Sequence, residues 1–318
     1  MDSLSTIKHV IEIIDLLDNP KIDGEKVMEF FYDKGFMDLK IDVETIKGEK
    51  SSTDFITIRI PGVGGKLVGG HAKTLGVIGR LGGIGARPSY IGLVSDADGA
   101  IVSLASAYKI AEMRKRGDIL PGDVIVTTHI CPNAPIRPYK PAPMMDSPVD
   151  IFTLLEKEVQ EDMDAVLSVD ATKANWVIKH TGFAITPTVK EGWILRVSAD
   201  LLDIYIRVSG EVPIIVPITM QDILPYTTPV YHINSMMQPW IYTTAPVVGV
   251  AITTRMILPG SGTGSTNYTS LEQATRFIVE VAKDYTSGRA KFYDEEEWET
   301  ILKIHGSVRD TMRKGVSR

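Results

Sequence analysis

Residues 90–131 read YIGLVSDADGAIVSLASAYKIAEMRKRGDILPGDVIVTTHIC, and this stretch decides the fold. The apolar run at 90–94 is too short for a helix, whereas apolar residues recur at helical spacing over 101–113. Gly117 ends that helix, and a second apolar run follows at 123–128. A strand, a crossover helix and a second strand in this order are nearly always parallel and right-handed. We therefore expect a parallel sheet.

Strands alternate with helices throughout the middle of the chain, which favours the α/β class. We expect a three-layer α/β/α fold with a mixed, mostly parallel sheet, in one domain over residues 1–318. Residues 1–60 are expected to pack on the core as two helices, at 3–17 and 23–32, and an antiparallel hairpin. The other predicted elements are helices at 149–163, 194–208, 271–285 and 294–312, and strands at 66–68, 165–169, 176–186, 213–218 and 247–253.

The composition excludes several classes of function. The chain carries 34 basic and 40 acidic residues, for a net charge of -6, which argues against nucleic-acid binding. A single cysteine excludes an internal disulfide framework and fits a reducing cytosol. The apolar run at 212–218 contains two prolines and is too short to span a bilayer, and the first 17 residues lack the pattern of a secretory signal. We expect a cytoplasmic protein that binds neither membranes nor nucleic acid.

Glycine is concentrated at residues 61–85, PGVGGKLVGGHAKTLGVIGRLGGIG. One interpretation is a flexible loop whose glycines allow close backbone packing. The other is that the glycines let the backbone approach an ion or a substrate beside His71. The phosphate-loop and dinucleotide-binding patterns are not met.

Four consecutive predicted strands end in side chains that can bind a metal or move a proton: His71, Asp96 with Asp98, His129, and Asp170. A single residue of this kind is usually structural. A parallel sheet, however, places the carboxyl ends of its strands along one edge, where ligands of open α/β folds bind. Imidazole nitrogen and carboxylate oxygen suit zinc and related divalent ions.

The segments SDADGAIVSLASAYKIAEM, LPGDVIVTT and PVVGVAITTRMILPG resemble the core of the co-catalytic zinc aminopeptidases and related metallopeptidases with a phosphorylase/hydrolase-like fold. The resemblance covers roughly residues 66–288. It implies that His71 is the first metal ligand, Asp96 the bridging aspartate and Asp170 the later aspartate. It further implies zinc or another divalent metal, and hydrolysis of a small amino-acid or peptide derivative. No lid or dimerisation domain is inserted.

Two departures from that family affect its chemistry. Where the family has its general-base glutamate and a neighbouring glutamate ligand, this chain reads HICPN at 129–133. Where the closing histidine is expected, it reads MIL at 256–258. His129, Cys131 or His232 can substitute, with one metal held by His71, Asp96 and either Asp170 or His129. Equally, the site can lack a metal.

The whole sequence is also similar to a bacterial and archaeal family of unknown function, domain of unknown function 1177, through motifs such as IGRLGGIGARP and YHINSMMQPWIYT. This resemblance implies no activity.

Several further side chains have alternative interpretations. Cys131 lies two residues from His129 and is a candidate nucleophile, although proline follows it at once. His180 is expected in the core, whereas His9 and His305 are expected at the surface. The apolar cluster at 231–240 is either a loop packed on the core, or a subunit interface or pocket wall. The segment GSGTGS at 260–265 is either a turn or an anion site.

Two functions remain open. The first is a metal-dependent hydrolase in which His71, Asp96 and Asp170 hold the metal and His129 is a ligand or base. The second is a non-catalytic small-molecule-binding or assembly-forming protein on the same fold. The expected partners are a small-molecule or peptide ligand and further copies of the chain in a homo-oligomer.

Overall fold

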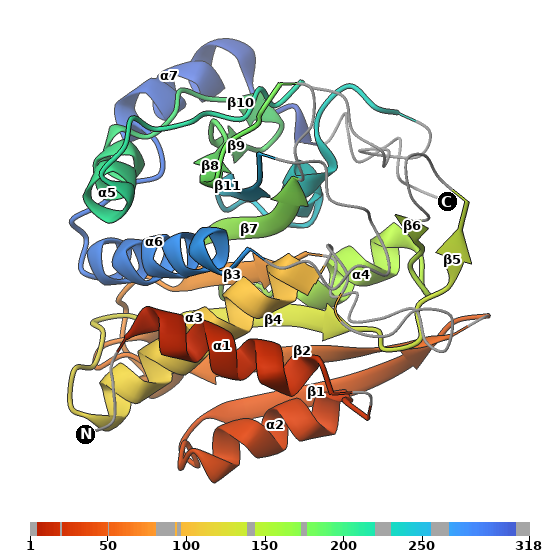
Figure 1. Ribbon diagram of the computed structural model, residues 1–318. Helices are drawn as coiled ribbons and strands as arrows, with labels where there is room; N and C mark the ends of the chain where they lie inside the picture. The colour runs from red at the N-terminus through yellow and green to blue at the C-terminus, as the bar shows by residue number, and fades with distance from the viewer. Residues whose placement is uncertain are drawn as a thin grey trace.

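The computed structural model describes residues 5–19, 21–49, 51–80, 93, 97–138, 144–172, 177–219, 230–255 and 267–309. Within these residues, one sheet has the strand order β1-β2-β4-β3-β7-β11-β9-β10, and β8 pairs with β11. A separate two-stranded ribbon joins β5 (Ile136–Arg137) to β6 (Met144–Met145). Figure 1 shows the large sheet running through the middle of the molecule, with helices in front of it and behind it.

The centre of the sheet is parallel. Its four parallel strands are β3 (Leu75–Gly79), β4 (Val124–Ile130), β7 (Ala165–Thr172) and β11 (Val247–Thr253). The antiparallel hairpin of β1 (Lys40–Lys47) and β2 (Ser52–Ile60) extends one side, and the short strands β8 (Gly182–Ile185), β9 (Val189–Lys190) and β10 (Trp193–Ile194) extend the other. The mixed sheet with its parallel centre and the N-terminal hairpin confirm the predicted α/β class and hairpin, although antiparallel pairings outnumber the parallel ones among the described strands.

Helices cover both faces of the sheet. On one face α1 (Thr6–Leu17), α3 (Asp98–Lys115) and α6 (Tyr268–Thr286) lie side by side (Figure 1), with α2 (Gly24–Asp33) against the hairpin and α5 (Ala199–Ser209) against α6. On the other face lie α4 (Ile151–Glu158) and the 3-10 helix η3 (Ser235–Tyr242). Helix α7 (Glu295–His305) follows α6 in the chain. No helix in the described part of the chain is long and apolar enough to cross a membrane.

Helix α3 begins where β3 and β7 end. It is buried around most of its circumference, because it packs between the sheet, α1 and α6. Its first turn approaches the sheet so closely that a Cβ on Gly99 would lie 2.1 Å from the carbonyl oxygen of Arg80 and 2.9 Å from that of Val169. Glycine at this position therefore lets the helix N-terminus rest on the ends of two strands.

The glycine-rich segment differs most from the prediction. The strand expected at 66–68 is a 3-10 helix, η1 (Lys66–Val68), and the strand is β3, inside the segment interpreted as a loop. The two glycines of β3 are closely packed: a Cβ on Gly76 would lie 2.3 Å from the sulfur of Met163, and one on Gly79 would lie 2.3 Å from Ser103 Oγ.

Smaller differences concern the ends of elements. The helices expected at 149–163 and 294–312 end at Glu158 and His305, and the segment 213–218 makes only an isolated bridge between Ile185 and Ile215. Helix α6 begins at Tyr268, three residues before the predicted start, with Asn267 as its N-cap. The predicted strand at 90–94 lies outside the described residues except for residue 93.

Candidate functional site

Three side chains form a row across the carboxyl ends of the parallel strands. The registers of β3 with β4 and with β7 place Arg80, the residue after β3, level with His129 and Asp170. The N–H of Arg80 donates to the carbonyl of Val169 at 2.8 Å, so the pairing with β7 continues to this level. Adjacent strands lie about 4.8 Å apart, so the three residues are close neighbours.

The three side chains point to the same face of the sheet. Two residues before His129, Thr127 Oγ1 donates to a backbone carbonyl of α4 at 2.8 Å. Two residues before Asp170, Ser168 Oγ donates to a backbone carbonyl of η3 at 2.6 Å. Because side chains alternate along a strand, His129 and Asp170 also face α4 and η3. Arg80 reaches the same two elements directly.

Glu158, at the end of α4, joins this row to the helices. Its Oε2 accepts a hydrogen bond from Arg80 Nη1 at 2.6 Å, and its Oε1 lies 2.9 Å from His129 Nδ1. Arg80 Nη2 donates to Gln238 Oε1 of η3 at 2.5 Å. All four side chains are buried. We call these four residues the Arg80 network.

The Arg80 network keeps Glu158 ionised inside the protein. Burial alone raises the pKa of Glu158, but the charge of Arg80 and the hydrogen bond from His129 outweigh it, and the pKa lies below its ordinary value. An ionised carboxylate only accepts hydrogen bonds, so His129 carries its proton on Nδ1. In the neutral imidazole, Nε2 is then an acceptor. The ring also packs against Phe55, with a centroid distance of 5.5 Å.

Two buried polar atoms at this edge have no hydrogen-bond partner among the described residues. They are Arg80 Nε and Thr253 Oγ1, the latter at the carboxyl end of β11. Orphaned buried donors are uncommon in folded proteins. Both atoms lie at the carboxyl edge of the sheet.

His71 does not join this site. It precedes β3 instead of ending a strand, and its side chain is exposed. The loop around it is fastened at the start of β4, where the carboxylate of Asp123 accepts from the N–H groups of Gly62 and Leu67, both at 2.8 Å. His71 therefore lies at the amino edge of the sheet, opposite Asp170. Asp96 lies outside the described residues.

The other predicted residues of the edge are brought together. His129 and Asp170 share the row, and Asp98 is buried in the first turn of α3, beside the ends of β3 and β7. The sequence reasoning missed Arg80 and Glu158. The sequence does mark Arg80, because a charged residue directly follows the apolar run LGVIG. Nothing in the sequence distinguishes Glu158 from the other charged residues of an ordinary amphipathic helix.

The described residues do not fit a resident divalent metal. Within them, no three His, Cys, Asp or Glu side chains are grouped so that they could hold an ion. His129 Nδ1 and both carboxylate oxygens of Glu158 are engaged within the Arg80 network. The guanidinium of Arg80 also repels a second cation in their midst.

Cys131 is not an activated nucleophile. It is buried, and its sulfur lies 3.8 Å from Ser51 Oγ. Burial raises the pKa of the Cys131 thiol to about 11, so it is protonated at neutral pH.

The remaining histidines have other environments. The expectation for His9 is wrong, because it is buried beside Glu112, whereas His305 is exposed as predicted. His180 is half-buried and lies 3.1 Å from Glu211 Oε2, outside β8. His232 is exposed just before η3.

The cluster at 231–240 is mostly core. Met236, Met237 and Trp240 are buried in η3, which confirms the interpretation as a loop packed on the core, while Tyr231 is exposed. The segment 260–265 lies outside the described residues.

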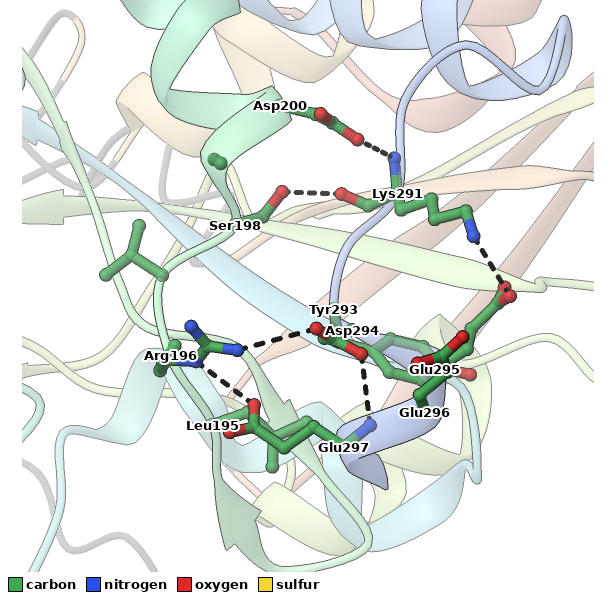
Figure 2. A pocket seen from close by; sticks show the side chains of 12 residues that line it. Leu195, Arg196, Ser198, Asp200, Lys291, Tyr293, Asp294, Glu295, Glu296 and Glu297 are labelled. Carbon is green, nitrogen blue, oxygen red and sulfur yellow. Dashed lines mark hydrogen bonds and ion pairs between the residues drawn. The ribbon is translucent and has the colours of Figure 1, made fainter. Parts of the chain in front are cut away.

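A hollow of about 550 Å³ lies between the start of α5 and the start of α7. Figure 2 shows hydrogen bonds and ion pairs among several of its charged side chains. Arg196 Nε lies 3.1 Å from Glu297 Oε2, and Lys291 Nζ lies 3.1 Å from Glu295 Oε2. These pairs are exposed and therefore weak. No residue of the Arg80 network lines the hollow.

Solved structures share this fold at low sequence identity. The Coxiella burnetii cytosol aminopeptidase gives a TM-score of 0.52 at 15% identity, over 89% of this chain and 69% of that chain. The bottromycin maturation enzyme BotP, solved in complex with Mn, gives 0.51 at 13%, over 87% and 70%. The Macrostomum lignano glutaminyl cyclase gives 0.50 at 12%, over 91% of both chains. These matches confirm the resemblance to an aminopeptidase-like fold.

The comparison with curated proteins gives no match. A family model described as "Protein of unknown function (DUF1177)" matches residues 44–315. This match spans most of the sequence and confirms the second resemblance, so the chain belongs to the DUF1177 family.

Proposed function

We propose that this chain is a small-molecule-binding protein on an aminopeptidase-like fold. Its ligand is a small amino-acid or peptide derivative with a free carboxylate, held at the carboxyl edge of β3, β7 and β11. One observation carries the proposal: the Arg80 guanidinium is buried at this edge, and its Nε–H has no partner among the described residues.

The Arg80 network favours binding over metal-dependent hydrolysis. Hydrolysis of the kind the resemblance implies needs a base that is free to take a proton from a metal-bound water. In this chain His129 and Glu158 bond to each other, and Glu158 also bonds Arg80. Glu158 is thus engaged by both neighbours and is not free to act as that base.

The chemistry of the orphaned donors points to a carboxylate. A buried guanidinium N–H forms its strongest hydrogen bond with an ionised acceptor. Thr253 Oγ1 offers a second polar atom two strands away from Arg80, on the order of 10 Å at ordinary strand spacing. Asp170 lies on β7, the strand between them, level with Arg80 and two residues short of the level of Thr253, and it matches an ammonium group. A zwitterion the size of a dipeptide satisfies all three positions.

Isothermal titration calorimetry of the tag-free protein tests this proposal. The probes are glycylglycine, glycyl-leucine and the amides of both peptides. We expect the free acids to bind and the amides to bind at least tenfold more weakly. The Thr253→Val variant should weaken binding of the acids, whereas the Arg196→Ala variant, in the hollow of Figure 2, should not. Equal affinity for acids and amides, or no binding of any probe, contradicts the proposal.

Hydrolysis of the bound peptide is the second candidate function. It is favoured by the Glu158–His129 hydrogen bond, which leaves Nε2 of His129 as an acceptor that can take a proton. Release of free leucine from glycyl-leucine, followed by chromatography, that is lost in the His129→Gln variant but kept in His305→Gln would support this candidate. No release above background from the wild-type protein argues for binding alone.

A further inference from the structure

We infer that the Arg80 guanidinium takes the place of a resident metal ion at the carboxyl edge of the sheet. It supplies the fixed positive charge there and keeps divalent cations out. This inference goes beyond the proposed function, because it concerns the charge of the site whether or not a ligand is bound.

Arg80 balances the charge of a buried carboxylate. Glu158 is fully buried as a side chain and its pKa lies below the ordinary value, so a carboxylate charge sits inside the protein. A buried carboxylate requires a nearby cation. Arg80 Nη1 provides it at 2.6 Å, and Gln238 Oε1 fixes the other end of the guanidinium at 2.5 Å. The cation is therefore covalently part of the chain.

The lone pairs that a metal ion would need are already engaged in hydrogen bonds. A metal needs ligand atoms with unprotonated lone pairs directed at it. His129 Nδ1 carries its proton toward Glu158 Oε1, and Glu158 Oε2 accepts from Arg80. Both residues are buried and have little room to turn away. The imidazole of His129 and the carboxylate of Glu158, which are best suited to bind an ion, are therefore already hydrogen-bonded within the Arg80 network.

The positive charge of a guanidinium group is permanent in water. Guanidinium stays protonated at every pH at which the protein is folded. A histidine or lysine in the same place could lose its proton to admit a metal, but Arg80 cannot. The exclusion of divalent ions should consequently hold across the physiological pH range.

Thermal unfolding with and without metal tests this inference. The variants are Arg80→Met, which removes the cation, and Arg80→Met with Glu158→Gln, which removes both charges. Arg59→Met is the control, since Arg59 pairs with Asp42 on the outer hairpin. Each protein is scanned in EDTA and in 1 mM MnCl₂, and metal content is measured by plasma mass spectrometry.

We expect the wild-type protein and Arg59→Met to contain substoichiometric metal and to show the same Tm in EDTA and in MnCl₂. Arg80→Met should have a lower Tm that MnCl₂ raises by about 3 °C or more, because Glu158 regains a cation. The double variant should recover part of the lost Tm and show no manganese response.

Two outcomes overturn the inference. One is stoichiometric metal in the wild-type protein with a Tm that falls in EDTA. The other is a folded Arg80→Met variant whose Tm does not respond to MnCl₂. If Arg80→Met does not fold, the double variant decides: a folded double variant with a Tm near that of the wild type supports charge balance, and an unfolded one contradicts it. None of these measurements involves a peptide ligand, so failure here is distinct from failure of the binding proposal.

Discussion

His129 Nδ1 lies 2.9 Å from Glu158 Oε1, and both side chains are at most 5% exposed. One residue lies in a central strand and the other ends a helix on the face above it. Together with Arg80 they form an internal ion-paired network at the edge where a sheet of this kind binds ligands. The position of this network determines how the chain should respond to substitution.

Replacing Glu158 with glutamine should strongly destabilise the protein. The change keeps the size of the side chain but leaves the buried Arg80 charge without its partner. We expect the free energy of unfolding in urea at pH 7.5 to fall by about 3–5 kcal/mol. The matched control is Glu44→Gln, whose exposed carboxylate pairs with Lys157 at 2.8 Å and should contribute less than about 1 kcal/mol. Equal losses for the two variants would argue against a buried ion pair.

The N-terminal helix should make stability depend on pH through His9. Burial lowers the pKa of His9 from its ordinary 6.5 by more than the hydrogen bond to Glu112 raises it. The unfolded chain therefore binds a proton at a higher pH than the folded chain does. The contribution to stability is complete above pH 6.5 and is lost as pH falls through the lower, folded-state pKa.

Urea unfolding at pH 7.5, 6.5 and 5.5 measures this effect. His9→Gln should flatten the decline in stability between pH 7.5 and 5.5, whereas His305→Gln, at an exposed position on α7, should leave the decline unchanged. If both variants keep the slope of the wild-type protein, His9 is not the titrating group.

Cys131 should resist thiol reagents in the folded protein. Because the pKa of its thiol is about 11, only a small fraction of Cys131 is the reactive thiolate at neutral pH. The side chain is also buried, so reagents have little access to it. Reaction with 5,5′-dithiobis(2-nitrobenzoate) at pH 7.5 should be about a hundredfold or more slower than in 6 M guanidinium chloride. Cys131→Ser should bind the peptide probes as the wild type does. Rapid labelling of the folded protein would restore the cysteine as a candidate nucleophile.

Gly99 should tolerate no side chain. A methyl group there would meet the carbonyl oxygen of Arg80 at 2.1 Å and so push the start of α3 away from the strand ends. We expect Gly99→Ala to lower the free energy of unfolding by about 1–3 kcal/mol. In Gly64→Ala the nearest atom, at 3.6 Å, is in ordinary contact, so that variant should be near neutral. Similar stability of both variants would contradict the close approach of α3.

The sequence predicted the fold better than the site. The alternation of strands and helices, the crossover helix and the hairpin at 39–60 follow from hydrophobic periodicity, which the core enforces. Strand β3 was not predicted because two of its five residues are glycine, which is unfavourable in strands. Packing against residues distant in sequence, such as Met163, stabilises the strand despite these glycines. Because β3 was interpreted as a loop, Arg80 was not recognised as the residue at the end of a strand.

The contacts of the site could not be predicted from the sequence, because they join residues that are far apart in the chain. Glu158 lies 78 positions from Arg80 and 29 from His129 in the chain. Only the placement of α4 above the sheet brings its carboxylate to both. The prediction of His129 and Asp170 at one edge succeeded because parallel strands impose it, whereas His71 was assigned to an element that is not a strand.

The most direct test is a crystal structure of tag-free protein grown with glycyl-leucine and MnCl₂, with data collected at the manganese absorption edge. We expect peptide density at the carboxyl edge, with the carboxylate within hydrogen-bonding distance of Arg80 Nε, and no anomalous peak beside His129, Glu158 or Asp170. A manganese peak bound by these side chains, with Arg80 displaced from Glu158, would contradict this expectation.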